Sequence, residues 1–163
     1  MPSDPASPEL LVIWHSRTGA SAQMARAAAR AKGAVLIRAR EVEAGRMLDA
    51  AGYLFVGPEN LASLSGEMKE MFDRTYYPLL GRIEGRPYAT IIAAGSDGEN
   101  AQRQLDRIAT GWRLKRVAEP KIANFDAQTP EEILAEKQVS ERILQECAEL
   151  GEGIAEGLRM GIF

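Results

Sequence analysis

Three hydroxyl side chains, a glycine and an arginine are crowded into residues 16–21, between an apolar run and an alanine-rich run. The hydroxyls can donate hydrogen bonds, the glycine lets a ligand approach the backbone closely, and the arginine adds a positive charge. If this segment joins a strand to a helix, the unpaired N–H groups of the first helical turn and the helix dipole also favour an anion there. The segment therefore suits a phosphate monoester, and its candidate ligand-binding residues are Ser16, Arg17, Thr18, Gly19, Ala20 and Ser21. The alternative is that Thr18 or Ser21 simply caps the helix.

Two further polar segments follow apolar runs, at residues 58–65 (PENLASLS) and 95–100 (GSDGEN). In a parallel sheet, loops that follow the strands meet at the carboxyl edge, where ligands bind near the point at which the winding reverses. We therefore expect these two segments to meet residues 15–21 in one site. The candidates that they contribute are Pro58, Glu59, Asn60, Leu61, Ala62, Ser63, Gly95, Ser96, Asp97 and Gly98.

The elements that would position these loops alternate along the chain. Continuous apolar runs are typical of strands buried on both faces, and residue spacings of three and four are typical of amphipathic helices. These patterns predict strands at 9–15, 34–39, 53–57, 88–94 and 114–122, and helices at 20–32, 43–51, 66–80, 100–111 and 131 to about 158. The predicted α/β fold is a doubly wound three-layer sandwich, whose five-stranded parallel sheet has the order 2-1-3-4-5 and helices on both faces. Residues 1–8 would form a disordered or extended leader, and residues 9–163 a single domain.

Three stretches carry a resemblance to a known superfamily. LLVIWHSRTGASAQMA (10–25) resembles the first strand, phosphate loop and helix of flavodoxin-like proteins, whose loop pattern is Ser/Thr-x-Thr-Gly-x-Thr/Ser. Residues 50–74 are similar to the segment in which a strand and a proline-bearing loop precede Ser-Gly-x-Met-Lys and a helix that ends in Asp-Arg. Residues 90–108 resemble the third, glycine-rich flavin loop. The resemblance is strongest to FMN-dependent NAD(P)H:quinone oxidoreductases and to unassigned flavodoxin-family proteins. It implies a flavodoxin-like fold, FMN as the cofactor and NAD(P)H as the co-substrate.

The chain departs from flavodoxins in one respect that bears on activity. Segments 58–65 and 95–100 contain no aromatic residue that could stack on the flavin ring. An uncovered ring suits an enzyme that passes electrons from NAD(P)H to a quinone or a similar small-molecule acceptor, with no catalytic side chains beyond the flavin site. Two alternatives stay open: an electron-transfer flavodoxin that serves protein partners, and a binding module without turnover.

Composition excludes other classes of function. The 163 residues carry a net charge of −3, whereas general nucleic-acid binders have a basic excess. No apolar run approaches the ~20 residues of a membrane span, and a single cysteine suits the reducing cytoplasm. We therefore expect a cytoplasmic protein without a metal, a nucleic-acid partner or a membrane span. The sequence leaves the oligomeric state open, a homo-oligomer included.

Three other features have more than one explanation. His15, the only histidine, would either approach the ligand or play a structural role, and we favour the second. Cys147 lies among apolar residues at helical spacing, which indicates a core thiol. A basic cluster either forms a solvated face or attracts the phosphates of NAD(P)H, and its members are Arg103, Arg107, Arg113, Lys115 and Arg116.

Overall fold

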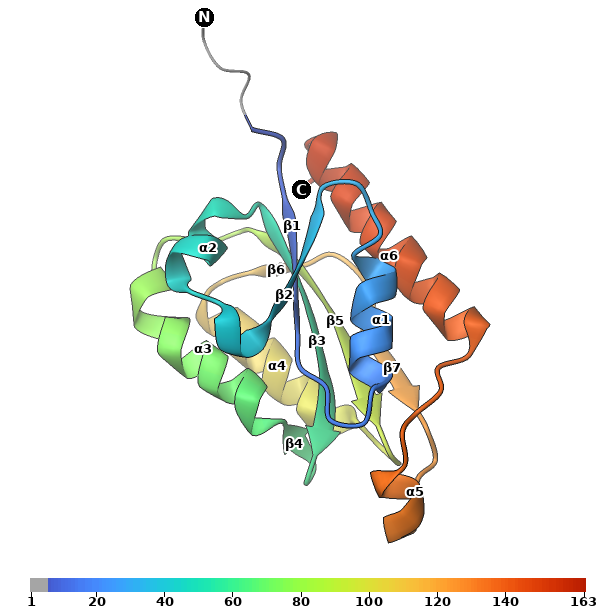
Figure 1. The fold of residues 1–163 in the computed structure, drawn as a ribbon. Coiled ribbons are helices and arrows are strands. Elements are labelled where there is room, and N and C mark those ends of the chain that lie inside the picture. Colours follow the sequence, from blue (N-terminus) through green and yellow to red (C-terminus); the bar gives the residue numbers. More distant parts are fainter. Residues whose placement is uncertain (1–5) are drawn as a thin grey trace, which may run out of the picture.

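A twisted parallel sheet runs through the centre of the molecule (Figure 1). The computed structural model describes residues 6–163; residues 1–5, which belong to the predicted leader, lie outside the described residues. The division into a leader and one domain stays a prediction. The four principal strands follow consecutive apolar runs and are parallel to one another in the order β2-β1-β3-β5. Their bounds are β1 Leu10–Trp14, β2 Ala34–Arg38, β3 Gly52–Asn60 and β5 Pro87–Ala94.

The edge beyond β5 differs from the predicted strand 114–122. It is divided into β6 (Lys115–Arg116) and β7 (Lys121–Asn124), both parallel to β5. Pro120 precedes β7 and has no N–H to give to the ladder, and Arg116 Nη1 donates to Ala118 O at 3.0 Å inside the gap. With β6 and β7 taken as one interrupted strand, the predicted order 2-1-3-4-5 is confirmed.

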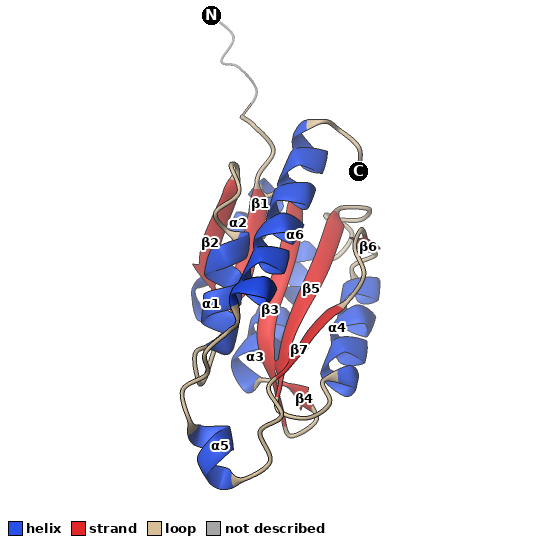
Figure 2. Cartoon of the chain, turned by 90° about the vertical axis from the view of Figure 1, so that its right-hand side faces the viewer, coloured by secondary structure: helices blue, strands red, loops and turns tan. Residues whose placement is uncertain are grey.

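Helices cover both faces of this sheet and complete the predicted three layers (Figure 2). One face packs against α1 and α6, and the other packs against α2, α3 and α4. Within residues 6–163 no helix has the length and hydrophobicity needed to cross a bilayer. The helices are α1 Ala20–Ala28, α2 Ala44–Asp49, α3 Gly66–Leu79, α4 Glu99–Gly111, α5 Pro130–Leu134 and α6 Glu141–Arg159, with a 3₁₀ turn, η1, at Ala39–Glu41.

The predicted closing helix from 131 to about 158 is wrong in its middle, because α5 ends at Leu134 and α6 begins only at Glu141. Thr129 and Ser140 are the N-cap residues of the two helices, so each helix has its own start. The glycines near the end do not break α6. A Cβ at Gly151 would lie 2.1 Å from Ala28 O, so the absence of a side chain lets α6 pack directly on α1.

The predicted loop 58–65 is also corrected, because β3 continues to Asn60 and then turns back. Ser63 and Leu64 form β4, which pairs antiparallel with β3. Leu61 and Ala62 form the turn with φ values of 50° and 60°, the left-handed conformation that a type I′ two-residue hairpin turn requires at both positions. The result is a short hairpin that projects beyond the carboxyl edge of the sheet.

Candidate functional site

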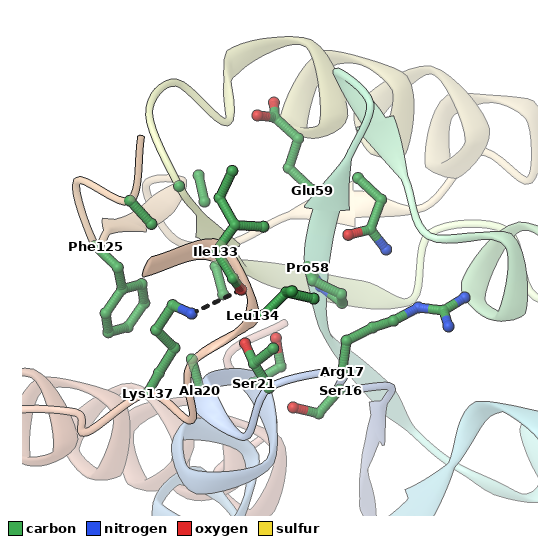
Figure 3. Close-up of a pocket in the computed structure, with 16 residues that line it drawn as sticks. Ser16, Arg17, Ala20, Ser21, Pro58, Glu59, Phe125, Ile133, Leu134 and Lys137 are labelled. Carbon is green, nitrogen blue, oxygen red and sulfur yellow. Dashed lines mark hydrogen bonds between the residues drawn. The ribbon is translucent and has the colours of Figure 1, made fainter. Parts of the chain in front are cut away.

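A cavity of about 220 Å³ opens at the carboxyl edge of the sheet, where β1, β3 and β5 end (Figure 3). Its walls come from the loop after β1, the ends of β3 and β5, and the segment that leads from β7 through α5. This is the place at which open α/β sheets bind ligands. The lining residues are Ser16, Arg17, Thr18, Ala20, Ser21, Pro58, Glu59, Asn60, Ala93, Ala94, Gly95, Phe125, Ala127, Ile133, Leu134 and Lys137.

The loop after β1 is shaped by a glycine. Gly19 is the N-cap residue of α1, and its φ of 98° is a left-handed conformation that favours glycine. Its N–H donates to Ser16 Oγ at 3.2 Å, so Ser16 closes the loop on itself. No side chain caps the helix, and the alternative that Thr18 or Ser21 caps α1 is therefore wrong.

The Ser21 hydroxyl is the group of this loop that is best placed to bind a ligand. The residue is 1% exposed, and its Oγ has no hydrogen-bond partner among residues 6–163. A buried polar group left unpaired costs about 1–3 kcal/mol. Ser21 lines the cavity in the first turn of α1, where N–H groups lack helical partners and the dipole is positive. An anionic oxygen placed there would pair with the hydroxyl and with these N–H groups.

The opposite walls come from two neighbouring strands. Pro58, Glu59 and Asn60 are the last residues of β3, and Glu59 Oε2 is buried without a hydrogen-bond partner in the described part of the chain. Residues 93–95 line the cavity at the end of β5 with small side chains, which leaves space between the strand ends. The cavity between these strand ends, which we call the slot, thus has small apolar residues at the end of β5 and a hydrogen-bond acceptor, Glu59 Oε2, at the end of β3.

The wall of the cavity opposite these strand ends is formed by α5 and the residues before it (125–134), and we call it the roof. Phe125, Ile133 and Leu134 line the cavity, and Figure 3 shows the two α5 side chains reaching across it towards the strand that carries Pro58. Ile133 is 51% exposed and Leu134 is 78% exposed, so both present apolar surface that no other part of the described chain covers. Lys137 Nζ donates to the carbonyls of Glu132, Ile133 and Ala135 at 2.6–3.0 Å and so stabilises the end of α5.

The segment after α5, which we call the strap (residues 135–139), is fastened to the loop after β1. The Lys137 N–H donates to Thr18 O at 2.8 Å. Gln23 Nε2 donates to Lys137 O at 2.7 Å and to Gly19 O at 3.1 Å, and Gln23 Oε1 accepts from the Val139 N–H at 3.3 Å. The roof and the loop after β1 are thus held together by the Gln23 side chain and by the backbone bond between Lys137 and Thr18.

His15 lies outside the cavity lining, on the other side of the strand end. It is 4% exposed, and its Nδ1 is 2.7 Å from Ser65 Oγ. Burial lowers the pKa of His15 below its ordinary value, although Glu67, 4.0 Å from Nε2, opposes this. Glu67 is itself held by Arg38, whose Nε lies 3.1 Å from the carboxylate. This group therefore joins β1, β2 and α3, and His15 has a structural role.

Residues 38–128, more than half of the chain, match the model of the NADPH-dependent FMN reductase family. The chain belongs to this family. The match contains the second and third predicted loops but begins after the loop at 16–21. The sequence has no match among the curated proteins.

Solved structures place this FMN reductase family member among flavodoxin-like folds. A flavodoxin, WrbA-like protein from Agrobacterium tumefaciens superposes with a TM-score of 0.76 at 17% identity, over 94% of this chain and 99% of that one. A flavodoxin from the domain Archaea gives 0.74 at 17% identity, over 93% and 99%. An NADPH-quinone reductase from P. pentosaceus gives 0.63 at 12% identity, over 88% and 97%. The predicted resemblance and fold class are confirmed.

The structure brings many of the predicted site residues of this FMN reductase family member together, but not all of them. Gly19 shapes the first loop without lining the cavity. The turn of the β3–β4 hairpin and most of segment 95–100 lie outside the cavity lining. The predicted residues outside the lining are Gly19, Leu61, Ala62, Ser63, Ser96, Asp97 and Gly98.

Sequence reasoning missed the part of the site that lies after β7. Phe125 follows β7 as a single aromatic residue, and nothing local predicts that it turns to the cavity. Thr129 and Glu132 form a capping box, a signal in the sequence that could have located the start of α5. The missed lining residues are Ala93, Ala94, Phe125, Ala127, Ile133, Leu134 and Lys137.

Proposed function

We propose that the cavity binds FMN, with the terminal phosphate in the loop formed by residues 16–21. The observation that carries this proposal is the buried, unpartnered Ser21 Oγ at the start of α1. A phosphate dianion can accept from this hydroxyl and from several first-turn N–H groups at once. Arg17 and Thr18 also line the cavity and supply a charge and a further donor. The residues present therefore fit the cofactor that the family uses.

The flavin ring would extend from this loop between the strand ends and the roof. Glu59 Oε2, buried without a partner, is an acceptor for a ring N–H. Ile133 and Leu134 offer an aliphatic surface to one face of the ring in place of the aromatic residues absent from segments 58–65 and 95–100. A cavity of about 220 Å³ is smaller than the ~300–1,000 Å³ of typical ligand sites, so part of the ring would project towards solvent.

For the activity, we propose electron transfer from NAD(P)H to a quinone or a similar small acceptor. Bound FMN supplies the hydride and electron chemistry. The chain holds the phosphate at residues 16–21, orients the ring through Glu59, and covers only part of it with α5. A ring left partly uncovered can receive a nicotinamide at hydride-transfer distance and then an acceptor at the same place.

Anaerobic reduction followed by absorbance distinguishes this enzyme from an electron carrier. The protein is loaded with FMN, freed of excess flavin and mixed with NADH or NADPH, with the flavin-free protein as the control. We expect the flavin absorbance to bleach with a nicotinamide alone and to return over repeated cycles when a quinone is added. A flavin that stays oxidised with both nicotinamides but accepts electrons from a reductase protein would show a carrier. Failure to retain FMN at all would favour a binding module.

A further inference from the structure

A second concave surface lies beside α4, on the far side of the β3–β4 hairpin from the flavin cavity. Its volume is about 490 Å³, and we call it the arginine groove. Two guanidinium groups, a hydroxyl and two carboxamides converge on it. The lining residues are Ser63, Asn100, Arg103, Gln104, Arg107 and Ile108.

The two arginines of this groove carry charge that the described part of the chain leaves without an acidic partner. Arg103 and Arg107 are four residues apart, so they project from the same face of α4, and both are exposed. None of the ion pairs within residues 6–163 includes either of them. Asp97 and Glu99 lie at the start of α4, and Asp106 is already held by Tyr88 and Arg116.

The groove and the flavin cavity share a wall. Asn60 lines the cavity, and Ser63, its partner across the hairpin, lines the groove. The hairpin is bound to α4 on both strands, since Leu64 N donates to Gln104 Oε1 at 2.8 Å and Asn100 Nδ2 donates to Ala62 O. Figure 2 shows α4 and β4 side by side at this edge of the sheet. A ligand that extends out of the cavity past the hairpin would therefore approach the guanidinium groups of Arg103 and Arg107.

Two other arginines near the site, Arg38 and Arg17, lie outside the arginine groove. Arg38 is paired with Glu67 and lies over the Trp14 ring at 5.6 Å, and Arg17 lines the flavin cavity itself. On the groove side of the hairpin, the guanidiniums that line the concave surface are those of Arg103 and Arg107. Arginine is the side chain best suited to phosphate, because its planar fork can donate two parallel hydrogen bonds.

We propose that the arginine groove binds the 2′-phosphate of NADPH while the nicotinamide lies at the flavin ring. This inference rests on the proposed function and assigns the preference for NADPH over NADH to Arg103 and Arg107. Ser63 and Asn100 add neutral donors to the same phosphate. NADH, which has a hydroxyl in place of the 2′-phosphate, gives the two arginines no anion to bind there.

The groove can be tested without flavin or turnover. Calorimetric titration with adenosine 2′,5′-bisphosphate is compared with adenosine 5′-monophosphate, which lacks only the 2′-phosphate. We expect the bisphosphate to bind at least about tenfold more tightly, and Arg103→Gln or Arg107→Gln to weaken it by about tenfold each. Arg113→Gln, which removes an exposed arginine outside the groove, is the matched control and should bind both nucleotides as the unmodified chain does.

Kinetics of the FMN-loaded protein give the second readout. Arg103→Gln and Arg107→Gln should raise the KM for NADPH by about tenfold with little change in kcat, and should change the KM for NADH far less. Ser63→Asp places a negative charge in the groove while both arginines remain, and should produce the same loss. The FMN dissociation constant should stay the same in all variants.

Two results would overturn this assignment. One is equal affinity for the two nucleotides, and the other is an arginine substitution that raises the KM of NADH and NADPH alike. Either could occur in a protein that binds FMN and oxidises NADPH, so the proposed function would then stand without the groove. Conversely, selective binding of the bisphosphate by a protein whose flavin is never reduced would leave the groove in place and remove the proposed reaction.

Discussion

Substitution of Ser21 by alanine separates a ligand-binding hydroxyl from a structural one. In the ligand-free protein, Ser21 Oγ is buried without a partner, so its removal relieves a penalty of about 1–3 kcal/mol in part, and alanine is also the better helix former. We expect the unfolding free energy to rise by about 1 kcal/mol, which for a chain of this size is about 2–4 °C in Tm.

The same substitution should weaken FMN. A hydrogen bond to a charged group contributes about 1.5–3 kcal/mol, so loss of the Ser21 contact should raise the dissociation constant about 10- to 150-fold. Titration of intrinsic tryptophan fluorescence gives the affinity, and thermal unfolding of the flavin-free protein gives the stability. The variant should thus be more stable and a poorer binder.

Ser140→Ala is the matched control, because Ser140 Oγ accepts from the Ile143 N–H at 3.3 Å and caps α6. This change should cost about 0.5–2 kcal/mol of stability with FMN affinity unchanged. If Ser21→Ala behaved in the same way, losing stability and keeping its affinity within about twofold, the phosphate assignment at residues 16–21 would be refuted.

Three further outcomes follow from the same structure. FAD should bind at least about tenfold more weakly than FMN in the fluorescence titration, because its phosphate is a diester with fewer free oxygens for residues 16–21; equal affinities would contradict the monoester site. Burial lowers the pKa of His15 below 6.5, so the unfolded chain binds more protons below that pH, and the unfolding free energy from urea titrations should fall as pH drops below about 6.5. His15→Asn should reduce this dependence of the unfolding free energy on pH. An unchanged dependence would show that other groups cause it. Burial raises the pKa of the Cys147 thiol to about 11, so a thiol reagent at pH 8 should label the protein in urea but not when folded.

Much of the sheet could be predicted because its signals are local. Runs such as residues 10–14 and 88–94 are apolar without alternation, which is typical of a strand covered on both faces. The loop at 16–21 was predictable for the same reason, since its hydroxyls and glycine are adjacent in sequence and enter a helix.

The rest depends on contacts between distant residues. Leu61 and Ala62 adopt left-handed φ values that sequence rules reserve for Asn and Gly, so the hairpin had no turn signal. The roof needs Gln23 to meet Lys137, which lies 114 residues further along the chain. Neither of these pairings leaves a periodic pattern in the sequence.

The hydrogen bonds between the strap and Gln23 also have a consequence for the assembly of the cavity, because they join segments that are synthesised at different times. The loop at residues 16–21 is synthesised well before the roof, because Lys137 lies 114 residues after Gln23. The strap leads directly into α6, which packs on α1, and this packing keeps the strap beside Gln23. A flavin that touches both Ser21 and Leu134 would therefore bind only once both segments are in place, and its binding would stabilise their contact against unfolding.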